Sequence, residues 1–174
     1  MRLFVALAPP SEVLAHADRV VAPVRERWPD VRWVPPERWH LTLAFYGEVP
    51  DEKVAGTERM IERRLAGDRS LASLELRLRG AGQFSRRAVW LGVDGEVLAL
   101  RRLARAVTFE RRPYRPHLTV GRLRGGSDAA GAVESLSAYE GPAWVSTTVH
   151  LVRSRLGPRP SYDDVAVFSL PRRP

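Results

Sequence analysis

Two histidines of this chain occupy the same local pattern, in which a threonine follows two residues later and apolar residues fill the alternate positions. The two tetrads are His40-Leu41-Thr42-Leu43 and His117-Leu118-Thr119-Val120. In a β-strand, alternate side chains share a face, so each tetrad places an imidazole beside a hydroxyl and turns its apolar residues to the opposite side. Since the chain has four histidines in total, a pattern that uses two of them indicates one site built from two copies.

A pair of imidazoles suits acid–base chemistry at phosphorus. Histidine titrates near neutral pH, so one ring can accept a proton from water while the other donates a proton to a departing alkoxide. The hydroxyls of Thr42 and Thr119 are candidates for holding the non-bridging phosphoryl oxygens, which carry negative charge through the transition state. Arg122 follows His117 on the same predicted strand, and a guanidinium fork matches phosphate oxygens better than an ammonium group does. The pattern therefore predicts His40 and His117 as the acid–base pair.

Metal binding is the competing use of two histidines. Neither tetrad contains Asp, Glu or Cys, and Glu48 is the carboxylate nearest to the first tetrad. Two histidines supply too few ligands for a closed zinc site, and a zinc site would not need the threonines. The sequence therefore predicts a reaction without a metal or another cofactor.

The tetrads and their surroundings resemble the two-histidine (2H) phosphoesterase family. Within that family they are similar to the bacterial and archaeal RNA 2′,3′-cyclic phosphodiesterases, formerly described as 2′-5′ RNA ligases. The resemblance covers nearly the whole chain and rests on Phe84 and on residues 2–6, 31–36, 40–49, 89–93, 116–122 and 149–162. The chain departs from the family at Tyr46, where a leucine is usual. It also lacks the glycine that normally follows the first proline of the turn at residues 157–161.

The repeat of strand, helix and His-x-Thr strand predicts an α+β fold with two pseudo-symmetric lobes, and the resemblance implies the same architecture with a pseudo-twofold axis. Each lobe is expected to be an antiparallel sheet with outer helices, and the two motif strands are expected to meet at a central cleft. Residues 1–174 would then form a single bilobal domain in which each lobe supplies one His-x-Thr strand.

The resemblance also implies hydrolysis of 2′,3′-cyclic phosphate ends of RNA or nucleotides to a 2′-phosphate, with the 3′-oxygen leaving. Because Arg122 shares a strand with His117, the phosphate is expected nearer the second motif. On that geometry His117 is the general base and His40 the general acid. Two alternatives stay open: 2′-5′ RNA ligation by the reverse chemistry, and a non-catalytic basic RNA-binding module, which would leave the repeated histidines unexplained.

The composition agrees with an anionic partner. The net charge is +8, from 28 basic and 20 acidic residues, and Lys53 is the only lysine. A positive balance favours polyanions such as RNA ends or small nucleotide cyclic phosphates, although genomic codon bias also produces arginine-rich, lysine-poor chains. The absence of cysteine excludes disulfides and thiolate sites. No segment has the pattern of a signal peptide or a membrane span, so we expect a cytoplasmic protein without an obligate protein partner.

Hydrophobic periodicity predicts an alternation of strands and helices. Ser11 is the expected cap of the first helix, Ser127 caps a short alanine-rich helix, and Pro23 is expected to kink or end the first helix near Ala22. The expected strands cover residues 3–8, 31–34, 39–46, 74–79, 88–93, 115–123, 145–152 and 165–170. The expected longer helices cover residues 11–27, the segment after Asp51, and residues 97–107.

Aromatic residues near the motifs are candidates for stacking on a nucleotide base. These candidates are Tyr46, Phe84, Tyr114 and Tyr162. Trp39 adjoins His40 in the strand, so it is expected to point away from the site. His16 and His150 lack a threonine two positions later, and we assign them no chemistry.

Overall fold

The computed structural model describes residues 1–85, 87–110, 112–123, 129–155, 157 and 161–172. Its described strands are β1 (Arg2–Leu7), β2 (Arg32–Trp33), β3 (Leu41–Glu48), β4 (Leu74–Phe84), β5 (Ala88–Gly95), β6 (His117–Arg122), β7 (Glu140–Ser146), β8 (Thr148–Arg155) and β9 (Ser161–Ser169). Its described helices are α1 (Ser11–Arg27), α2 (Asp51–Gly67), α3 (Val97–Val107), α4 (Ala130–Leu136) and the 3₁₀ helix η1 (Pro36–Arg38).

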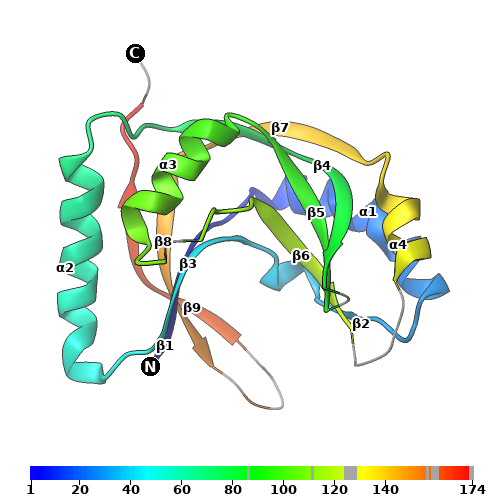
Figure 1. Cartoon of the computed structure of the whole chain (residues 1–174), viewed down its shortest axis with the longest axis horizontal. Helices are drawn as coiled ribbons and strands as arrows, with labels where there is room; N and C mark the ends of the chain where they lie inside the picture. Colours follow the sequence, from blue (N-terminus) through cyan, green and yellow to red (C-terminus); the bar gives the residue numbers. More distant parts are fainter. Residues whose placement is uncertain (86, 111, 124–128, 156, 158–160, 173–174) are drawn as a thin grey trace.

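The strands form one curled antiparallel sheet made of two halves (Figure 1). One half has the order β7-β4-β5-β6, and the other has the order β3-β1-β8-β9. The halves meet where β3 pairs with β6 through Leu41 and Leu118. These two leucines hold the same position in the two His-x-Thr tetrads, so the sequence repeat lies at the junction of the halves. The predicted antiparallel α+β fold is confirmed, with the two expected sheets joined edge to edge.

Helices cover the sheet and enclose the core. Helices α1 and α4 pack against each other; α1 also contacts β7, and α4 contacts β4 and β5. At the other end of the molecule, α3 packs against β3 and β4, and α2 packs against α3 (Figure 1). Leu41, Leu118 and Val120 are fully buried in this core. Because they are buried, the alternate residues of the two motif strands face away from the helices.

Helix α1 differs from its prediction at two residues. It spans the predicted residues 11–27 with Pro23 inside it, so it does not end near Ala22; the alternative, a kink at Pro23, stays a prediction. Val21 and Val24 are buried on one side of the helix, and their packing outweighs the hydrogen bond that a proline removes. The expected cap is also displaced by one residue, because Pro10 takes the cap position and Ser11 is the first helical residue.

One predicted strand is divided between the two halves. Residues 145–152 were expected to form a single strand, but β7 ends at Ser146 and β8 begins at Thr148. Strand β7 pairs with β4, whereas β8 pairs with β1 and β9. Thr147 is therefore where the chain crosses from one half to the other. The predicted cap Ser127 and most of the turn at residues 157–161 lie outside the described residues.

Candidate active site

A cavity of about 470 Å³ opens between the two halves of the sheet. All five residues predicted to act on a phosphate line it: His40, Thr42, His117, Thr119 and Arg122. Phe84 and Tyr162, two of the predicted stacking residues, line it as well. The junction at Leu41 and Leu118 explains this convergence, since the flanking side chains of both tetrads face the same side of the sheet.

The two imidazoles are held by equivalent hydrogen bonds. His40 Nδ1 lies 2.8 Å from the carbonyl oxygen of Arg38, and His117 Nδ1 lies 2.7 Å from the carbonyl oxygen of Arg115. A carbonyl oxygen only accepts, so Nδ1 of each ring carries the proton and donates it. The neutral ring then has an acceptor at Nε2. This atom of each histidine is left to exchange protons with a ligand.

Aromatic rings flank both imidazoles. The His40 ring lies 4.7 Å from the ring of Phe4 and 5.2 Å from that of Tyr162, centroid to centroid. The His117 ring lies 4.8 Å from the ring of Phe84 in an edge-to-face arrangement. Phe84 and Tyr162 therefore fix the orientation of the histidines, and their role in stacking on a base stays a prediction.

Burial and positive charge make both histidines weak bases. The pKa of His40 is lowered from its ordinary 6.5 to about 4, chiefly by burial; the hydrogen bond to Arg38 raises it, and the positive fields of Arg122 and His117 lower it by smaller amounts. The pKa of His117 is lowered by burial first and then by Arg122. Both rings are therefore neutral at pH 7 in the unliganded cavity. A bound anion raises both pKa values, because it stabilises the protonated rings.

Tyr46 does not face the histidines, contrary to its prediction as a stacking residue. The pairing of β1 with β3 shifts between Val5 and Ala6, which leaves Leu43 as an extra residue on β3. Such a bulge reverses the alternation of side chains beyond it. Phe45 consequently lines the histidine cavity in place of Tyr46.

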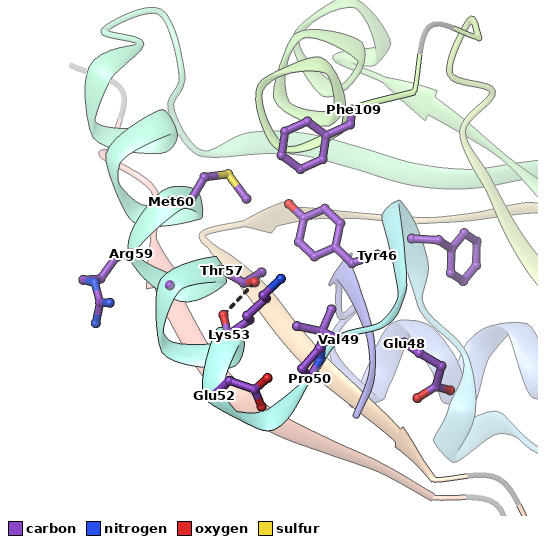
Figure 2. Close-up of a pocket in the computed structure, with 12 residues that line it drawn as sticks. Tyr46, Glu48, Val49, Pro50, Glu52, Lys53, Thr57, Arg59, Met60 and Phe109 are labelled. Atoms are coloured by element: carbon purple, nitrogen blue, oxygen red, sulfur yellow. Dashed lines mark hydrogen bonds between the residues drawn. The ribbon is translucent and has the colours of Figure 1, made fainter.

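The ring of Tyr46 points into a separate hollow of about 790 Å³ beside α2 (Figure 2). There it lies 5.9 Å from the ring of Phe109, and its hydroxyl donates a hydrogen bond to the carbonyl oxygen of Val107. Burial raises the pKa of Tyr46 to about 12. Its hydroxyl thus stays protonated and ties β3 to the end of α3.

Tyr114 lies in a groove that adjoins the histidine cavity. This groove has a volume of about 480 Å³ and shares Thr42, Phe45 and His117 with the cavity. Burial raises the pKa of Tyr114, and its hydroxyl has no hydrogen-bond partner among the described residues. The structure thus places this predicted stacking residue next to the cavity instead of inside it.

Several lining residues were missed in the sequence. Phe45 is 59% exposed and borders both the cavity and the groove. No local sequence pattern predicts the bulge that places its side chain on the cavity side of β3. Arg38 ends η1 two residues before His40 and lies outside the predicted strand, so strand alternation gave no signal for it. Arg2 and Arg32 come from β1 and β2 and also line the cavity.

Within the described part of the chain, no group of three or more His, Cys, Asp or Glu residues is arranged to hold a metal ion. A search of the same residues finds no helix with the length and apolar character needed to cross a membrane.

Comparison with known proteins extends over most of the chain. Residues 9–158 match the family described as the 2′-5′ RNA ligase superfamily. The chain is 32% identical to an RNA 2′,3′-cyclic phosphodiesterase of Methanothermobacter thermautotrophicus, over 98% of this chain and 99% of the relative. It is 34% identical to a protein of the same name from Archaeoglobus fulgidus, over 97% of this chain and 99% of the relative.

The fold is also similar to that of a solved structure. The chain is similar to Escherichia coli LigT complexed with 3′-AMP, with a TM-score of 0.75, 27% identity and 97% of each chain covered.

Proposed function

Because the chain belongs to the 2′-5′ RNA ligase superfamily, we propose that it hydrolyses the 2′,3′-cyclic phosphate at RNA ends to a 2′-phosphate. The observation that carries the proposal is the meeting of the two His-x-Thr repeats at Leu41 and Leu118. That junction gives one cavity two imidazoles, each with Nδ1 bound to a carbonyl oxygen and Nε2 left for proton exchange.

The chemistry is a displacement at phosphorus by water. Nε2 of one histidine removes a proton from the attacking water while the new P–O bond forms. The P–O3′ bond breaks, and the second histidine donates its proton to the departing 3′-oxygen. The products are a 2′-phosphate monoester and a free 3′-hydroxyl. Thr42, Thr119 and Arg122 bind the non-bridging oxygens and stabilise their charge in the transition state.

In this proposal His117 is the general base and His40 the general acid, since Arg122 draws the phosphate toward the second motif. The pKa values of the unliganded cavity favour the opposite assignment. The pKa of His40 is lowered more than that of His117, so the His40 ring is the less readily protonated of the two, although a general acid must carry a proton. The role of His40 therefore depends on the phosphate anion, which raises its pKa on binding. A product complex with the freed 3′-hydroxyl beside His40 supports this distribution of roles, and a 3′-hydroxyl beside His117 reverses it.

The proposal also covers the domain organisation, the substrates and the cellular compartment. Residues 1–174 act as a single bilobal domain, because each half contributes one of the two histidines. The substrates are RNA ends or small nucleotide cyclic phosphates, and the reaction takes place in the cytoplasm. Ligation would use the same residues in reverse, but water outcompetes a 5′-hydroxyl end at ordinary RNA concentrations.

The test is the turnover of 2′,3′-cyclic AMP by histidine variants. His40→Ala and His117→Ala should each lower kcat by about 10²–10⁴, the contribution of one general acid or base. His150→Ala is the matched control, because His150 bonds to Asp164 outside the cavity. Near-normal kcat in either site variant, with circular dichroism showing a folded protein, would remove that histidine from the mechanism.

A further inference from the structure

The lining of the histidine cavity carries more positive charge than a single cyclic phosphate can balance. The described lining residues include Arg2, Arg32 and Arg38 besides Arg122, and they contain no Asp or Glu. None of the ion pairs formed by the described residues involves these four arginines. A cyclic phosphodiester carries one negative charge, which Arg122 alone balances. Three guanidinium groups are left without an anion.

The sheet register holds two of these charges opposite each other. Arg32 of β2 is the direct cross-strand partner of Arg122 of β6. Like charges in this position destabilise strand pairing. A second anion at Arg32, beside the cyclic phosphate at Arg122, removes that repulsion.

The other two arginines line the same cavity and come from different elements. Arg2 lies on β1 two residues before Phe4, whose ring contacts His40. Arg38 ends η1 two residues before His40, and its Nε is buried without a hydrogen-bond partner among the described residues. A buried guanidinium nitrogen without an acceptor is costly. The cost is recovered when a ligand supplies an oxygen.

The groove that adjoins the cavity offers a weaker attraction to anions. The adjoining groove contains Arg112 and Arg115, but Glu110 also lines it and offsets part of their charge. Long-range attraction therefore guides a polyanion toward the part of the cavity lined by Arg2, Arg32 and Arg38.

We propose that Arg2, Arg32 and Arg38 form a second phosphate subsite, which binds the phosphate on the 5′ side of the nucleotide that bears the cyclic phosphate. This inference rests on the proposed function and names the preferred substrate of the same site. An RNA strand leaves the cavity past these three arginines, and a strand end is a better substrate than a nucleoside 2′,3′-cyclic phosphate without a 5′-phosphate.

The kinetic test compares 2′,3′-cyclic AMP with the same nucleotide carrying a 5′-phosphate. In the wild-type protein the 5′-phosphate should raise kcat/KM by about tenfold or more, the ratio that corresponds to 1.4 kcal/mol. Arg2→Ala with Arg32→Ala should reduce this gain to less than about twofold and leave hydrolysis of 2′,3′-cyclic AMP unchanged. Arg112→Ala with Arg115→Ala is the matched control and should keep the gain.

Two kinetic results would overturn the subsite. One is a wild-type kcat/KM that does not respond to the 5′-phosphate. The other is a gain that survives in the Arg2 and Arg32 double variant but is lost in the Arg112 and Arg115 control, which would move the strand to the adjoining groove.

A binding test separates this subsite from the proposed reaction. Calorimetry should show that adenosine 3′,5′-bisphosphate binds the wild-type protein about tenfold or more tightly than 3′-AMP does. The Arg2 and Arg32 double variant should bind both ligands with nearly equal affinity. This result would hold even if no cyclic phosphate were turned over, whereas equal affinities in the wild type would refute the subsite whatever the enzyme hydrolyses.

Discussion

Acidification should destabilise this protein through the buried ring of His40. The pKa of this ring is lowered from 6.5 to about 4 in the folded chain, chiefly by burial. An unfolded chain takes up a proton at this ring near its ordinary pKa, whereas the folded chain resists protonation until the pH is much lower. The unfolded state therefore binds more protons between these two values, so the free energy of unfolding falls as the pH falls through this window.

The size of the effect follows from the difference between the two pKa values. A shift from 6.5 to about 4 corresponds to about 3 kcal/mol, at about 1.36 kcal/mol for each pKa unit. This is a large part of the 5–15 kcal/mol that is typical for a folded domain. The lowered pKa of His117 acts in the same direction.

A non-titrating variant isolates the contribution of His40. In His40→Asn the side-chain amide can still donate to the carbonyl oxygen of Arg38, but it takes up no proton. Urea unfolding of both proteins, followed by tryptophan fluorescence, gives the free energy of unfolding at about pH 7 and about pH 4. Carboxylate protonation destabilises both proteins alike. Between these two pH values, the wild-type protein should lose about 3 kcal/mol more than the variant.

An equal loss in the two proteins would refute the reasoning, because it would mean that His40 is protonated as easily in the folded chain as in the unfolded one. A smaller loss in the wild type would reverse the sign of the effect and would require a carboxylate partner for the ring.

Three further predictions concern the phosphate ligands and the pH profile. Arg122→Lys should lower kcat/KM by about tenfold or more, because an ammonium group cannot reproduce a two-pronged contact; steady-state kinetics that stay within about twofold of wild type would place the clamp elsewhere. Thr42→Val and Thr119→Val keep the strand shape and remove a hydroxyl, so each should cost roughly 10- to 100-fold in kcat/KM, the value of a hydrogen bond to a charged group. The bell-shaped profile of kcat/KM should peak below pH 6.5, since the pKa values of His40 and His117 are both lowered. The profile of kcat should peak at higher pH, since the bound phosphate raises both pKa values, and coincident optima would contradict this.

The convergence of the site could be predicted because it depends on short-range alternation and on a repeat. Each histidine lies two residues from its threonine, and a strand needs no long-range information to place both on one face. The repeat then indicated that the two strands share a site, and the pairing of Leu41 with Leu118 shows how they meet. The two lobes followed from the repeat of strand, helix and His-x-Thr strand, and the resemblance to a family implied the same architecture.

The errors arise where packing overrides a local pattern. The bulge at Leu43 leaves no mark in the sequence, so Tyr46 was assigned to the wrong face and Phe45 was missed. Hydrophobic alternation runs through Thr147, yet the chain changes from one half of the sheet to the other there, because β7 and β8 pair with different strands. Pro23 is kept inside α1 by the buried valines beside it.

The most direct test of the central claim is phosphorus NMR of the product formed from 2′,3′-cyclic AMP. Displacement by water with departure of the 3′-oxygen predicts a single product, adenosine 2′-phosphate, which should form without added metal. It should not form with the His40→Ala and His117→Ala variants on the same timescale. A 3′-phosphate product would contradict the proposed leaving group, and an unchanged cyclic phosphate after prolonged incubation with the wild-type protein would contradict the proposed reaction itself.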